Sequence, residues 1–219
     1  MRHPLGRAIL QSTKNMEQAY LLFQQVMSRV EKELGFPADF MINLLREDDW
    51  SFLIKIHAVI EAAITKTLCS HLDPKLISIF EQLELNDSRT GKTAFAKSLL
   101  LLTCEQRQFI TELSKVRNKV VHDIKRVSFK FSDFVKELDK NQRKNFIDAI
   151  ISFTTSPEGK TAWRKYATED PKVAIWANTF SLLIRTTTDA KSARIEKEIR
   201  LEKAKLWDDT FGKLNNANK

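Results

Sequence analysis

Arg117, Asn118 and His122 are the residues of this sequence whose types and spacing best suit chemistry on a polar substrate. The imidazole of a histidine titrates near neutral pH, so His122 could act as a general acid or a general base. The guanidinium of Arg117 is a planar set of donors that matches phosphate oxygens. Asn118 could donate a hydrogen bond to the same phosphate or orient His122. The three residues therefore predict proton transfer at a phosphate group, and they imply no cofactor and no metal.

The helix expected over residues 104–122 decides whether these side chains are accessible. At 100° per residue, four apolar side chains fall within about 60° of one another and define the core face: Phe109, Leu113, Val116 and Val120. Asn118 and His122 point nearly opposite to that face, and Arg117 lies on the flank between them. A solvated basic face explains the same spacing, and on spacing alone it is the simpler interpretation.

Positive charge is concentrated around this helix. The chain has a formal net charge of +8, and residues 115–130 carry +5 of it, with six basic residues and one acidic residue. A basic stretch of this kind favours a polyanionic partner without requiring one.

The other candidate residues have simpler interpretations. Glu61 lies four residues after His57, so both share one helix face and could form a surface or interface pair. His57 itself is expected to be a satisfied, partly buried histidine. The sequence Gly91-Lys92-Thr93 resembles the end of a phosphate-binding loop, but Asn86 stands where the first glycine is needed, so a helix start is expected instead.

The sequence has no cluster with metal-binding spacing. Its four histidines are scattered, and its two cysteines do not have zinc-site spacing. Cys69 and Cys104 each fall in an apolar helical stretch, which predicts buried free thiols in a reducing compartment.

The composition predicts an all-α protein. Gly and Pro number 5 each among 219 residues, too few for a protein rich in turns. The apolar periodicity predicts helices over 13–34, 36–45, 48–72, 74–85, 93–102, 104–122, 134–138, 141–153 and 171–206. Residues 127–131 alternate as in a short extended segment, and residues 154–159 are expected to form a hinge. We expect one helical domain over 1–219, with a core bundle at 13–138 and a helical extension at 139–219. No membrane span or secretory signal is recognisable, so a cytoplasmic protein is expected.

The stretch from Val116 to Asp123 resembles the R-x4-H motif of the HEPN superfamily, including the polar residue after the arginine. The order of elements from about Trp50 to Leu138 is similar to that of the mannitol-repressor-like branch. The resemblance implies an up-and-down helical bundle, often dimeric, and for many members a metal-independent endoribonuclease of toxin–antitoxin or antiphage systems. The repressor branch tends to lack a complete Arg/His pair, whereas this chain has both residues.

The resemblance also implies a composite site at the interface of a homodimer, which would gather two histidines and two arginines around one phosphate of RNA. Glu61 would be an accessory residue, and an antitoxin or regulatory protein would be a further partner. Under this hypothesis the basic residues form a groove for the RNA backbone: Lys115, Lys119, Lys125, Arg126 and Lys130. The alternative is a non-catalytic transcriptional regulator of the mannitol-repressor kind that acts through protein partners.

Overall fold

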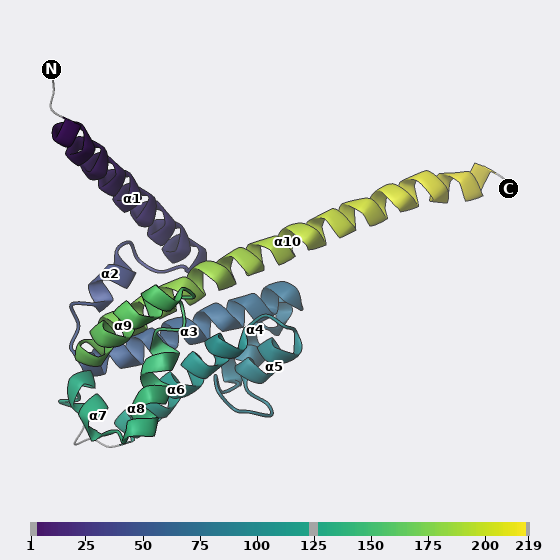
Figure 1. The fold of residues 1–219 in the computed structure, drawn as a ribbon. Helices are drawn as coiled ribbons and strands as arrows, with labels where there is room; N and C mark the ends of the chain where they lie inside the picture. Colours follow the sequence, from purple (N-terminus) through teal and green to yellow (C-terminus); the bar gives the residue numbers. More distant parts are fainter. Residues whose placement is uncertain (1–3, 123–126, 218–219) are drawn as a thin grey trace.

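The computed structural model describes residues 4–122 and 127–217, with side chains described over 15–122 and 127–207. Within these ranges the chain is all α, as the composition predicts, and it forms a helical bundle with a long C-terminal helix (Figure 1). The elements in chain order are α1 (Pro4–Leu34), α2 (Phe40–Leu44), α3 (Asp49–His71), the 3-10 helix η1 (Pro74–Leu76), α4 (Ile77–Gln82), α5 (Lys92–Ser98), α6 (Cys104–Val121), α7 (Phe131–Glu137), α8 (Lys140–Ile150), α9 (Pro157–Glu169) and α10 (Pro171–Ala217).

Helix α3 is the centre of the bundle. Its N-terminus is capped as expected, since the carboxylate of Asp48 accepts a 2.9 Å hydrogen bond from the backbone N–H of Ser51. The helix is apolar over most of its circumference because α5, α6 and α10 pack around it. Phe52, Ile56 and Ile60 are completely buried there.

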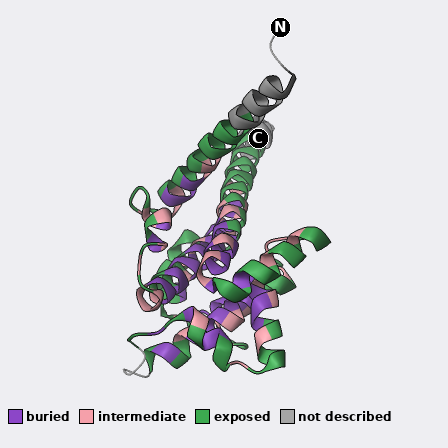
Figure 2. Cartoon of the chain, turned by 60° about the vertical axis from the view of Figure 1, so that its left-hand side comes forward, coloured by how far each residue is buried: buried purple, intermediate pink, exposed green. Residues whose placement is uncertain are grey.

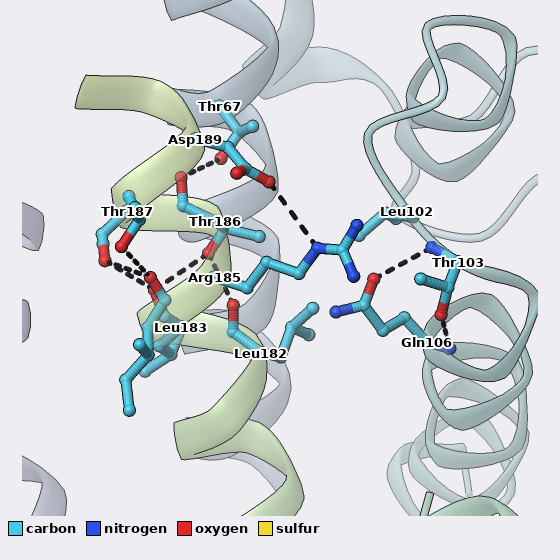
Figure 3. A network of polar contacts seen from close by, with 12 residues as sticks. Thr67, Leu102, Thr103, Gln106, Leu182, Leu183, Arg185, Thr186, Thr187 and Asp189 are labelled. Carbon is cyan, nitrogen blue, oxygen red and sulfur yellow. Dashed lines mark hydrogen bonds and ion pairs between the residues drawn. The ribbon is translucent and has the colours of Figure 1, made fainter. Parts of the chain in front are cut away.

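The first half of α10 packs along α3 and carries the expected apolar stripe. The indole Nε1 of Trp176 donates a 2.6 Å hydrogen bond to the carbonyl of Met41. Further along, the hydroxyl of Thr67 in α3 donates to the carbonyl of Thr186 in α10 at 3.3 Å (Figure 3). The Thr67 hydroxyl thus satisfies its hydrogen bond inside a helix contact that excludes water.

The helix that carries the candidate motif begins at a capping box. The side chain of Thr103 accepts from the backbone N–H of Gln106 at 3.2 Å, and the Gln106 amide oxygen accepts from the backbone N–H of Thr103 at 2.9 Å. This reciprocal pair fixes the start of α6, and its apolar face then packs against α3 and α8.

Two expectations about the later helices are wrong. The hinge expected at 154–159 is the start of α9, where Ser156 is the N-cap, its hydroxyl accepts from the Gly159 N–H at 3.0 Å, and Pro157 is the first helical residue. The extended segment expected at 127–131 is not a strand, because Phe131 begins α7. The alternation of aromatic residues there reflects a packed cluster, in which the Phe129 and Phe131 ring centroids are 5.0 Å apart.

Other boundaries and one burial prediction also differ. Helix α1 begins at Pro4, not near residue 13. Helix α5 ends at Ser98, not near residue 102, because Leu100 adopts a left-handed conformation with φ of 58°. Cys69 is a buried free thiol as expected, but Cys104 is exposed because it is the first residue of α6.

Two helices extend well beyond the bundle. The N-terminal part of α1 and the distal half of α10 project from it in Figure 1, and the residues there whose exposure is described, 15–25 and 191–207, are mostly exposed (Figure 2). Over the part of the chain that the structure describes, no helix combines the length and apolar character needed to cross a membrane.

Candidate active-site pocket between α3, α4 and α6

Helix α6 presents the motif as its helical phase predicts. The four residues of the core face, Phe109, Leu113, Val116 and Val120, are all buried. Asn118 and His122 are exposed, and Arg117 is half-buried on the flank between the two faces. His122 is the C-cap residue of α6, and its backbone N–H donates to the Asn118 carbonyl at 3.3 Å.

The side chains of Arg117 and Asn118 contact each other directly. Arg117 Nη1 donates a 3.0 Å hydrogen bond to Asn118 Oδ1. Among the described residues, no carboxylate is paired with Arg117. Since a guanidinium has five N–H donors, most of them stay available for phosphate oxygens.

The three motif residues line one cavity of about 650 Å³. Its walls come from α3, from α6, and from the end of α4 with the loop that follows it. The other lining residues are His57, Glu61, Glu81, Gln82, Leu83, Glu84, Leu85, Asn86, Ser114 and Lys115. The structure therefore brings the motif together with the accessory candidate Glu61 and with Lys115.

A second histidine lies in the wall of this pocket. His57 is buried, as expected, and its Nε2 is hydrogen-bonded to Ser114 Oγ at 3.1 Å. Burial, followed by the nearby charge of Arg117, lowers the pKa of His57 to about 4, although the Glu61 carboxylate opposes the shift. The imidazole is therefore neutral at pH 7.

Sequence patterns alone do not predict that His57 lies beside the motif of α6. His57 and Ser114 are 57 residues apart, and only the packing of α3 against α6 brings them together. Two local signals point toward it: Glu61 shares a helix face with His57, and Ser114 places a hydroxyl one turn before Asn118 on α6.

Glu61 has a different partner from the one its spacing suggests. Its Oε1 lies 2.5 Å from Lys92 Nζ, and the Lys92 side chain is only 2% exposed whereas that of Glu61 is 33% exposed. Gly91 permits this contact, because a Cβ there would lie 2.4 Å from the backbone nitrogen of Asp87. The Gly91-Lys92-Thr93 sequence is thus a helix start, as expected, and its buried lysine forms an ion pair with Glu61.

The basic residues predicted to bind RNA are spread over different surroundings. Lys115 lines the pocket and forms a 2.7 Å ion pair with Glu112. Lys119 is exposed with its Nζ 5.6 Å from the Phe134 ring centroid, and Lys130 is the exposed N-cap of α7.

Two of the predicted RNA-binding residues, Lys125 and Arg126, lie outside the described residues. On the opposite wall of the pocket, Glu81 and Glu84 add negative charge. The pocket therefore has one basic side, on α6, and one acidic side, after α4.

No group of three or more histidine, cysteine, aspartate and glutamate side chains within 4–122 and 127–217 could hold a metal ion. Comparison of the chain with family models, curated proteins and solved structures gave no match.

Proposed function

We propose that this chain is a metal-independent endoribonuclease of the HEPN type. The observation that supports the proposal is the content of one pocket, where Arg117, Asn118 and His122 lie beside a neutral histidine, His57. A guanidinium that has no carboxylate partner among the described residues, and two imidazoles, are groups that phosphodiester cleavage can use when no metal takes part.

The proposed reaction is an internal transfer at phosphorus. A base removes the proton of the ribose 2′-hydroxyl, and the 2′-oxygen attacks the adjacent phosphorus. The bond from phosphorus to the 5′-oxygen breaks, and an acid protonates that oxygen. The products are a 2′,3′-cyclic phosphate and a 5′-hydroxyl end. Arg117 stabilises the charge on the phosphate oxygens, and Asn118 donates a further hydrogen bond.

A single histidine cannot easily serve as both acid and base in one turnover, so the proposal needs a second one. In the first arrangement a homodimer supplies it, and a composite site gathers Arg117 and His122 from both copies. In the second arrangement His57 of the same chain is the base, reached directly or through the Ser114 hydroxyl, and His122 is the acid. Both arrangements use the same bond changes and differ only in which chain supplies the second imidazole.

The basic side of the pocket would hold the RNA backbone. Lys115 is within the lining, and Lys119 and Lys130 are exposed near the same end of α6. Under the proposal Lys125 and Arg126 also bind the RNA backbone. Replacing either with alanine should weaken RNA binding and reduce its salt dependence while the chemical step stays unchanged.

The proposed role of such an enzyme is that of a cytoplasmic toxin or antiphage effector. A nuclease that acts on cellular RNA has to be restrained, so an antitoxin or another regulatory protein is its expected partner. The acidic wall formed by Glu81 and Glu84 would repel RNA that enters from the α4 side, which favours entry over α6.

The alternative proposal is a mannitol-repressor-like regulator without catalytic activity. The observation that favours it is a set of exposed apolar side chains on α4 and around the end of α5, a composition suited to a protein partner: Ile77, Ile79, Phe95, Leu99 and Leu100. If this alternative is correct, the pocket is a polar part of a binding surface and no reaction occurs there.

Cleavage of RNA in the presence of EDTA tests the proposed nuclease. Wild-type protein should release fragments that end in 2′,3′-cyclic phosphate, and His122→Ala should be slower by about 10²–10⁴-fold. Arg117→Lys should also lose most activity, because an ammonium cannot make the same two-point contact. His71→Ala, which changes a histidine outside the pocket, is the matched control and should cleave like wild type. Equal inactivity of wild type and His122→Ala, with a specific protein bound to both, would favour the regulator.

A further inference from the structure

The chain exposes much more surface than a compact protein of its mass. Its accessible surface is 14698 Å², whereas a compact monomer of 25.4 kDa exposes about 10,300 Å². The excess is about 4,400 Å² for one chain. This excess surface arises because parts of α1 and α10 project from the bundle (Figures 1 and 2).

Helix α1 carries one apolar stripe that is only partly covered. Where α1 meets the bundle, the Phe23 ring packs 5.4 Å from the Phe180 ring, and Met27 and Val30 are buried. Residues at 16, 20, 23, 27 and 30 share one face at 100° per residue, so Tyr20 and Met16 continue the same stripe beyond the bundle.

The segment of residues 15–25, which we call the α1 arm, exposes large apolar side chains. Met16, Tyr20, Leu21 and Leu22 are each between 56% and 66% exposed. Four such residues within seven positions are unusual for a surface helix in water. A helix of this length also gains little stability alone, because most helical stability comes from packing of the apolar face.

The charge of the α1 arm indicates what covers it. Glu17 is its only charged residue among eleven, in a chain that is 29% charged. In a two-fold contact, each side chain near the axis faces its own counterpart, so charged residues there would repel each other. Glutamine amides and a tyrosine hydroxyl both donate and accept, so Tyr20 on the stripe and Gln24 beside it can pair with their own copies.

The distal half of α10, unlike the α1 arm, is rich in charged residues. Residues 191–205 contain six basic and three acidic side chains, and two copies of that segment would repel each other.

We infer that the α1 arm pairs with the α1 arm of a second copy of this chain, as a two-fold helix contact that buries the apolar stripe. Among the described residues, those that line the candidate pocket come from α3, α4, α6 and the loop after α4, and none comes from α1. The inference is therefore independent of whether the pocket cleaves RNA.

Light scattering of the full chain tests the pairing. Wild type at micromolar concentration should have twice the mass of 25.4 kDa. The double variant Met16→Glu/Tyr20→Glu, which places charge on the exposed part of the stripe, should raise the dissociation constant by at least about 100-fold. Leu201→Glu, which adds the same charge to a similarly exposed leucine on α10, is the matched control and should leave the mass unchanged.

Disulfide trapping is a second test of the pairing, and its outcome does not depend on whether the double variant folds. In a Cys104→Ser background, single cysteines are introduced on or beside the stripe as Met16→Cys, Tyr20→Cys and Gln24→Cys, with Leu201→Cys as control. The two-fold axis passes through the contact between the two α1 arms, so at least one of these positions lies close to its own copy. Mild oxidation should therefore give a covalent dimer at that position and none at residue 201. A monomeric wild type, or a dimer that survives the double variant and forms no disulfide at any of the three positions, overturns the inference.

Discussion

The buried histidine of the pocket makes stability depend on pH by an amount that can be calculated. The pKa of His57 is lowered from 6.5 to about 4 on folding, so between these values the unfolded chain binds a proton that the folded chain excludes. The free energy of unfolding therefore falls as the pH drops through 6.5, and this contribution is exhausted once the pH is below about 4. Because one pKa unit is worth about 1.4 kcal/mol, acidification from about pH 7.5 to about pH 4.5 should remove about 2.5 kcal/mol.

Urea unfolding at the two pH values measures this contribution when wild type is compared with His57→Gln. Glutamine can still hydrogen-bond to Ser114 but does not titrate, and the carboxylates common to both proteins cancel in the comparison. The variant should lose about 2.5 kcal/mol less than wild type on acidification. Ser114→Ala removes the hydrogen-bond partner and leaves the burial, so it should keep most of the pH dependence. If wild type and His57→Gln respond to acid identically, His57 is not sequestered from water and the reasoning fails.

Three further predictions concern the turn after α5, the Glu61–Lys92 ion pair and the source of the second histidine. Leu100 is 87% exposed and has φ of 58°, so Leu100→Gly should stabilise the protein by about 0.5–1 kcal/mol in thermal unfolding, because glycine adopts this conformation without steric strain. Glu61→Gln leaves the buried Lys92 charge without a charged partner and should destabilise by about 2–3 kcal/mol, whereas Lys92→Met should cost less because water reaches Glu61; the opposite order in urea unfolding would contradict this. Excess His122→Ala added to a fixed amount of wild type should lower the RNA-cleaving activity if the site needs a His122 from each copy, because mixed dimers then contain one His122, and unchanged activity would assign the second histidine to the same chain.

The sequence predicted the phase of α6 correctly because that information is local. The core face of this helix repeats every three or four residues, and the capping residue Thr103 precedes it directly. The exposure of Asn118 and His122 follows from the same periodicity. By contrast, the contact of His57 with Ser114 depends on how α3 crosses α6. Nothing in a short stretch of sequence specifies that crossing.

Start signals were harder to interpret than apolar periodicity. Ser156 and Pro157 are the N-cap and first residue of α9, but the same residue types also occur in turns. The helix that follows buries little apolar surface, so its periodicity was too weak to identify it. Lys92 shows the same limitation in another form, since a lysine after a glycine gives no sign that it is buried against Glu61, 31 residues earlier.

The link between Arg117 and His57 leads to a last prediction, in which a bound phosphate changes the basicity of the histidine. The Arg117 guanidinium is the second-largest cause that lowers the pKa of His57, after burial. A phosphate held by Arg117 would offset that positive charge and favour the protonated imidazole. His57 would then become a stronger base only when substrate is bound, which is when a base is needed.

Titration of the histidine ring nitrogens by NMR measures this coupling directly. The pKa of His57 should be about 4 in the free protein, and it should rise when inorganic phosphate or a non-cleavable dinucleotide is added. Arg117→Gln should raise the pKa in the absence of ligand and abolish the response to phosphate, because the charge that phosphate offsets is already gone. Asp148→Asn, which removes a carboxylate paired with Arg164 far from the pocket lining, should leave both values unchanged. If phosphate binds and the pKa of His57 does not move, Arg117 is not the group that receives the phosphate, and the roles proposed for these two residues are wrong.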